Sequence, residues 1–296
     1  MILVIAIEDS AAYKRIIMLK RIITAVCLIA LMVPVLYFSY TWVFPAVVSL
    51  VSVICVFEMV RCMGFHKKIE MALPLYFFAA IFPFLLRFYE NDFYVAGMAM
   101  IAIISYIAYI FVLVIFSSGT LSYTEACAMC LTVFYIIFAY NMVLYIRDYK
   151  NGQFIYVLIF VGAWVTDTFA YFTGVLFGKH KLAPDVSPKK TIEGAIGGIV
   201  FCAIGFVVTG LIIDLIYDGV TPNYIYLAVS GLAVGAISQA GDLIMSVIKR
   251  HYGIKDYGNI FPGHGGLLDR TDSMLAVAFG VDGMIMFSYL TGITLF

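Results

Sequence analysis

The chain has 296 residues, of which 64% are hydrophobic and only 12% are charged, and its formal net charge at pH 7 is zero. Soluble domains contain about 45–50% apolar and about 25% charged residues, so this composition excludes a water-soluble globular protein. We therefore expect a chain that lies in a lipid bilayer, with no nucleic-acid partner.

The first predicted element is a cytoplasmic N-terminal segment, residues 1–21. Its apolar stretch Met1–Ile7 precedes a basic cluster, which is the reverse of the order in a signal peptide. We expect Met18 to be the natural start of the protein and the residues before it to be an upstream extension.

Residues 22–296 are expected to form a single transmembrane catalytic domain. A helix needs about 20 apolar residues to cross the ~30 Å hydrocarbon layer, and lipid offers the backbone no other hydrogen-bond partner. The sequence therefore predicts an all-α polytopic protein with about nine transmembrane helices. The third span is short and contains Pro74 and Pro83. The predicted spans are Ile22–Tyr40, Val43–Val60, Met71–Leu86, Phe93–Phe116, Glu125–Ile146, Phe154–Phe177, Gly194–Tyr217, Tyr224–Ile248 and Ser273–Phe296.

Lysine and arginine residues predict how these spans are oriented, because they concentrate in cytoplasmic segments. With the N-terminus in the cytoplasm and the C-terminus outside, all but three of the 18 Lys and Arg residues lie on the inner side. The three exceptions are Arg87, Arg147 and Lys150. The two longest polar connections, 178–193 and 249–272, are also cytoplasmic, so we expect an active site facing the cytoplasm and built mainly from residues 160–273.

Asp167 and Asp242 are carboxylates that fall inside predicted spans. A charged side chain there costs about 2.5–3.5 kcal/mol on insertion scales, so it usually faces a cavity and serves a function. By helical rise, Asp167 lies roughly 16 Å and Asp242 roughly 12 Å below the cytoplasmic ends of their helices. The alternative for each is a structural hydrogen bond between helices.

The eighth span carries a polar stripe that strengthens the functional interpretation. Its members are spaced at i, i+3, i+7, i+10 and i+11, which we assign to one helical face. A carboxylate and a hydroxyl lie deep, and two cations lie at the cytoplasmic end. Such a gradient suits a divalent metal below bound phosphates. The residues are Gln239, Asp242, Ser246, Lys249 and Arg250.

The connection that follows is dense in groups that bind phosphate and metal. Its glycines allow backbone N–H groups to close on an anion, and its last two carboxylates open the final helix, whose N-terminus favours negative charge. His264 by itself is as consistent with a hydrogen-bonding loop residue as with a catalyst. The candidates are Lys255, Asp256, Gly258, His264, Gly265, Gly266, Asp269, Arg270 and Asp272.

The other cytoplasmic connection ends in a second group of candidates, beside a helix N-terminus that would favour a triphosphate. Paired lysines near a membrane can equally be topology determinants or headgroup contacts. Of the glycines that follow, Gly197 and Gly198 are assigned to helix packing. The candidates are Ser187, Lys189, Lys190, Thr191, Glu193 and Gly194.

Both groups of residues resemble the phosphatidate cytidylyltransferase (CDP-diacylglycerol synthase) family. The similarity is strongest from about residue 160 to the C-terminus. It rests on Ser246, Lys249, Arg250, Lys255, Asp256, Gly258, Phe261, Pro262, His264, Gly265, Gly266, Asp269, Arg270 and Asp272, and on Asp167, Tyr171, Gly174, Gly178, Lys179 and the segment 187–194.

The resemblance implies a homodimeric, multi-pass enzyme of the bacterial inner membrane that needs Mg²⁺ and a second, monovalent cation such as K⁺. Asp242 and Asp269 match the metal-binding acidic positions of the family. Residues around the phosphates would be Lys189, Lys190, Ser246, Lys249 and Arg250.

The expected reaction joins the phosphate of phosphatidic acid, a membrane lipid, to the α-phosphorus of CTP and releases pyrophosphate. Asp167 would complete the ion site or hydrogen-bond a lysine. The sequence leaves two alternatives. A CTP-dependent kinase of polyprenol or phytol type would need a carboxylate base, and a transporter of anionic solutes would be expected to show internal repeats.

Overall fold

The computed structural model describes residues 33–88, 92–117, 119, 121–261 and 265–296. This part of the chain contains eight helices that are long and apolar enough to cross a membrane, which confirms the all-α polytopic prediction. Most of the predicted span Ile22–Tyr40 lies outside the described residues, although residues 33–37 are helical. The expectation about Met18 also falls outside them.

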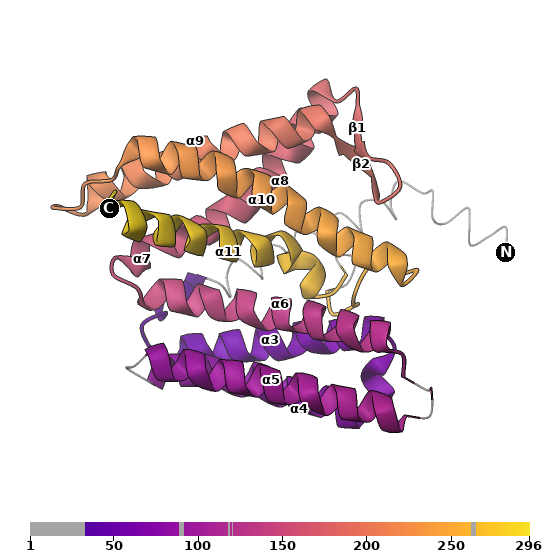
Figure 1. Cartoon of the computed structure of the whole chain (residues 1–296). Helices are drawn as coiled ribbons and strands as arrows, with labels where there is room; N and C mark the ends of the chain where they lie inside the picture. The colour runs from indigo at the N-terminus through magenta and orange to yellow at the C-terminus, as the bar shows by residue number, and fades with distance from the viewer. Residues whose placement is uncertain (1–32, 89–91, 118, 120, 262–264) are drawn as a thin grey trace.

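The first half of the described chain forms a bundle in which α3, α4 and α6 pack on one another and α5 covers α4 and α6 (Figure 1). The short third span is confirmed as the 20-residue helix α4, with both prolines inside it. Such prolines are tolerated in membrane helices because neighbouring groups satisfy the freed backbone carbonyls. The elements are α3 (Val43–Cys62), η1 (Phe65–Lys67), α4 (Ile69–Phe88), α5 (Asp92–Phe116) and α6 (Tyr123–Asp148).

The second half adds four long helices, a short helix and a hairpin. The polar connection 178–193, for which no secondary structure was predicted, folds into two antiparallel strands that pair Lys181 with Thr191 and Ala183 with Ser187. The hairpin lies at the end of the bundle where α10 ends and α11 begins (Figure 1). The elements are α7 (Gly152–Ile155), α8 (Val157–Phe177), β1 (Lys181–Ala183), β2 (Ser187–Thr191), α9 (Ile192–Ile216), α10 (Tyr224–His251) and α11 (Leu268–Thr291).

Glycines allow α8 and α9 to approach closely, as predicted for Gly197 and Gly198. A Cβ at Gly197 would collide with Thr173, and a Cβ at Gly198 would lie 2.8 Å from the backbone oxygen of Thr166. Small residues permit this contact in membranes, where burial against lipid gives no driving force of its own. The pair α8–α9 in turn positions the hairpin that joins these two helices.

This packing predicts that Gly198→Leu destabilises the protein. The added side chain must displace α8, and overpacking typically costs about 1–3 kcal/mol. The midpoint of thermal unfolding in detergent should therefore fall. Gly283→Leu is the matched control, because no atom lies within 4 Å of a Cβ built at that helical glycine. Equal midpoints for the two variants would contradict the packing interpretation.

Candidate active site

Polar side chains from α8, β2, α10 and α11 contact one another. Figure 1 shows the hairpin, the end of α10 and the start of α11 at the same end of the bundle. Ion pairs join β2 to α10 and α10 to α11, and a hydrogen bond joins α8 to α11. We call this group the polar cluster. Its members are Asp167, Lys190, Gln239, Asp242, Lys249, Asp269, Asp272 and Ser273.

Lys249 is the buried cation of the polar cluster. Only 8% of the residue is exposed, and its Nζ lies 3.0 Å from Asp269 Oδ1 and 3.4 Å from Asp272 Oδ2. The ammonium also lies over the ring of Tyr257, 5.2 Å from its centroid. Burial raises the pKa of the Tyr257 hydroxyl well above its usual value, so the ring stays neutral. The surroundings of Lys249 therefore favour a charged ammonium.

Asp269 also anchors the segment before α11. Its Oδ2 accepts the backbone N–H groups of Tyr257 at 2.7 Å and Gly266 at 2.9 Å. Gly265 has a φ of +84°, a conformation that favours glycine, and it sets the turn that aims the next N–H at the carboxylate. A carboxylate has about four acceptor directions. Together with Lys249, these contacts use three of the acceptor directions of Asp269 and leave about one for another partner.

Asp242 has more free capacity. It pairs with Lys190, and 22% of the Asp242 side chain is exposed. Lys190 also donates to Gln239 Oε1 at 3.2 Å. Two other predicted residues shape the hairpin that carries this lysine. Thr191 caps α9 by accepting the N–H of Gly194, and Glu193 accepts backbone N–H groups at the start of the hairpin. The local fold thus places Lys190 against the membrane-embedded part of α10.

The polar cluster has an excess of acid. Asp167 accepts a hydrogen bond from Ser273 Oγ at 2.8 Å, not one from a lysine, and it interacts electrostatically with Asp242. Asp242 in turn interacts with Asp272. Within the polar cluster four carboxylates face two lysines, so full ionisation of the carboxylates would leave two more negative than positive charges. A divalent cation would balance them.

The donor set fits Mg²⁺, although no preformed metal cage exists in the described part of the chain. No group of three or more His, Cys, Asp or Glu side chains there could hold a metal ion by itself. Mg²⁺ prefers oxygen ligands and is usually bound through one or two carboxylates together with substrate phosphates. The polar cluster supplies such oxygens, and both Asp242 and Asp167 keep part of their side chains exposed.

Other predicted site residues lie apart from the polar cluster. Arg250 departs from the predicted stripe, because its Nε donates to Val186 O at 3.2 Å and its Nη1 to Ile254 O at 3.0 Å. Ser246 is buried on α10. His264 lies outside the described residues. Ser187 is half-buried at the start of β2, and the remaining candidates are exposed: Lys189, Lys255, Asp256 and Arg270.

The sequence interpretation missed Glu58. This residue lies on α3, is only 1% exposed, and bonds the backbone at the start of α11. The signal was available, because the argument from intramembrane carboxylates that singled out Asp167 and Asp242 applies equally to Glu58 within Val43–Val60. Its partner lies more than 200 positions away, and no sequence spacing indicates that contact.

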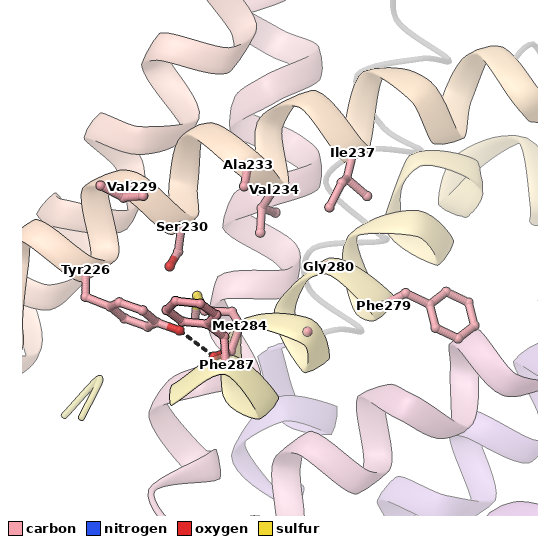
Figure 2. A pocket seen from close by; sticks show the side chains of 11 residues that line it. Tyr226, Val229, Ser230, Ala233, Val234, Ile237, Phe279, Gly280, Met284 and Phe287 are labelled. Atoms are coloured by element: carbon pink, nitrogen blue, oxygen red, sulfur yellow. Dashed lines mark hydrogen bonds between the residues drawn. The ribbon is translucent and has the colours of Figure 1, made fainter. Parts of the chain in front are cut away.

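An apolar cavity of about 450 Å³ lies between α10 and α11, away from the polar cluster. Figure 2 shows Tyr226, Val229 and Phe287 among the side chains around it. The hydroxyl of Tyr226 donates to the backbone oxygen of Met284 at 2.5 Å. The cavity therefore offers no charged group to a nucleotide, and the polar cluster is the candidate active site.

Comparisons with known proteins point to one family. Residues 19–288 match the model of the Cytidylyltransferase family. The chain is 41% identical to a phosphatidate cytidylyltransferase of Bacillus subtilis (strain 168) over 160 residues, 54% of this chain and 58% of that protein. It is 35% identical over 164 residues to the Staphylococcus saprophyticus protein of that name, 55% of this chain and 60% of that protein. The chain thus spans about 60% of the length of these relatives.

Proposed function

Because this chain belongs to the cytidylyltransferase family, we propose that it makes CDP-diacylglycerol from CTP and phosphatidic acid. The observation that carries the proposal is the polar cluster. It joins lysines to an excess of carboxylates at one end of a membrane-spanning bundle. An enzyme that brings a polyanionic nucleotide to a lipid phosphate needs positioned cations, and carboxylates that can hold a metal ion, close together.

The reaction forms one bond and breaks one bond. A phosphate oxygen of phosphatidic acid attacks the α-phosphorus of CTP, and the bond from that phosphorus to the oxygen bridging the β-phosphorus breaks, releasing pyrophosphate. The nucleophile is already an anion, so no general base is required. The main barrier is the repulsion between two polyanions, which positioned cations relieve.

Lysines from the hairpin and from the end of α10 would share the phosphates. In this proposal Lys189 and Lys190 on β2 bind the CTP phosphates, and Lys249 with Arg250 positions the lipid phosphate. The pairs of Lys190 with Asp242 and of Lys249 with Asp269 keep these ammonium groups near the acidic residues. When bound, Mg²⁺ supplies positive charge for the CTP phosphates and for the leaving pyrophosphate. Asp242 and Asp269 are the residues proposed to hold it.

The setting proposed for this chemistry is the inner membrane of a bacterium, with the polar cluster open to the cytoplasm, where CTP is found. The positive-inside distribution supports this orientation, since 15 of the 18 Lys and Arg residues fall on the cytoplasmic side of the predicted topology. On the basis of the family resemblance, we also propose that the protein forms a homodimer and binds a monovalent cation such as K⁺.

One assay tests this function. Purified protein in mixed micelles is incubated with CTP labelled at the α-phosphorus, phosphatidic acid and Mg²⁺, with and without a chelator. We expect labelled CDP-lipid and pyrophosphate in equal amounts, and loss of both with the chelator. In a parallel reaction with polyprenol or phytol in place of phosphatidic acid, phosphorylated lipid together with labelled CDP would instead identify a kinase. Turnover of neither kind would contradict an enzymatic function and lead to transport measurements in vesicles.

A further inference from the structure

Glu58 makes two hydrogen bonds across the bundle from α3 to the start of α11. Its Oε1 accepts the backbone N–H of Leu267 at 3.1 Å, and its Oε2 accepts that of Leu268 at 2.8 Å. The first N–H groups of a helix have no partner within the helix, and α11 has no side-chain cap at its own N-cap residue, Leu267. Glu58 therefore supplies from a distant helix the acceptors that α11 lacks.

A buried carboxylate on a membrane-crossing helix is costly unless its charge is compensated. Two backbone donors and the positive end of the α11 dipole provide that compensation here. The surrounding chain is adapted to the side chain. A Cβ at Gly258 or at Gly266 would collide with the Glu58 carboxylate. Glycine at these two positions therefore makes room for the Glu58 carboxylate, which is a reason for its presence that involves no contact with substrate.

Arg61 lies one turn further along α3 and holds the other end of the same segment. Its Nη2 donates to the backbone oxygen of Tyr257 at 2.7 Å. One turn of α3 therefore bonds the segment 257–268 at both ends. The backbone N–H groups of Tyr257 and Gly266, at the two ends of that segment, are the donors that orient Asp269.

We propose that Glu58 is a positioning residue for the cytidylyl transfer: by fixing the start of α11 it holds Asp269, and through Asp269 the ammonium of Lys249, in the geometry that the reaction needs. This inference rests on the proposed function. Glu58 itself contacts neither substrate. Arg61 assists by holding the first residue of the segment.

Glu58→Gln tests the proposal, because an amide can accept one of the two N–H groups but turns its own NH₂ toward the other. We expect the kcat of the folded variant to fall about 10–100-fold, the usual loss when a supporting hydrogen bond is removed. The KM for CTP should change less than kcat, because the CTP lysines lie on the hairpin, which packs on α8 and α9, and Asp242 on α10 is not held by Glu58. Hydrogen exchange at the amides of Leu267 and Leu268 should become faster.

Glu70→Gln is the matched control, since it makes the same chemical change at an exposed site in the first turn of α4. A Glu58→Gln protein that keeps the wild-type kcat, KM and exchange rates would overturn the proposal. So would a variant whose only defect is a smaller yield of folded protein with normal kcat.

Gly266→Ala provides a second test in case Glu58→Gln does not fold. This substitution keeps the charge of Glu58, but the added methyl group pushes the carboxylate away from the start of α11. A reduced kcat is therefore expected, and wild-type turnover would contradict the proposal. Absence of CDP-lipid synthesis by the wild-type protein would instead refute the proposed function. The exchange rates at Leu267 and Leu268 would still show whether Glu58 anchors α11.

Discussion

Asp242→Asn is expected to reduce CDP-diacylglycerol synthesis by about 10³-fold, in the range seen when one preorganised electrostatic group is removed from an active site. The substitution keeps the shape of the side chain and deletes its charge. Asp242 has more open acceptor capacity than Asp269 and is the ion-pair partner of Lys190. The loss of its charge should weaken metal binding and also leave Lys190 without its ion-pair partner, with only Gln239 as an acceptor.

The folded state should survive this change, because Asp242 is partly exposed and accepts no backbone N–H group among the contacts of the described residues. Turnover by the purified variant should be measured together with its thermal unfolding midpoint. Asp214→Asn, at the far end of α9 where the carboxylate accepts from Tyr224, is the matched control. Near-normal turnover by Asp242→Asn would count heavily against the proposed mechanism.

Asp269→Asn is expected to abolish activity and also to lower stability. This carboxylate accepts two backbone N–H groups and the Lys249 ammonium. An asparagine must turn its NH₂ toward one of these donors. Breaking a buried ion pair by changing one partner costs about 3–5 kcal/mol, because the remaining charge stays buried.

The measurement compares thermal unfolding and size-exclusion profiles of the two variants before activity is assayed. Asp269→Asn should unfold at a lower temperature than Asp242→Asn, and its 257–268 segment should exchange amide hydrogens faster. If both variants lose activity with equal and unchanged stability, Asp269 acts only at the metal and the anchoring role assigned here is wrong.

These two predictions separate residues that the family resemblance treats alike. Both Asp242 and Asp269 match metal-binding positions of the family, and the sequence interpretation gave them one role. In the structure, Asp242 faces the hairpin lysine with part of its side chain exposed, whereas Asp269 is enclosed by its donors. Hydrogen-bond saturation is a property of the folded neighbourhood, so spacing along the chain does not indicate it.

Arg250 illustrates a related limit. Neighbouring residues on a helix point about 100° apart, so Lys249 and Arg250 do not share a face. With Lys249 turned toward Asp269 on α11, Arg250 reaches the hairpin and Ile254 instead. The polar stripe of α10 was predictable from Gln239 through Lys249. Which of the two cations enters the bundle depended on where α11 packs.

The amino-acid sequence by itself determined that this chain is a polytopic membrane protein. Of its residues 64% are hydrophobic, and they form runs of about 20 residues, the length that crosses the hydrocarbon layer of a bilayer. Its local patterns also placed the short span α4, the packing glycines of α8 and α9 and the polar stripe of α10. Only the tertiary structure decided which charges meet. The pairs Lys190–Asp242 and Lys249–Asp269, and the reach of Glu58 to α11, join segments 20 to 210 positions apart. Helix packing sets such contacts, and a periodic pattern along one helix contains no information about its neighbour.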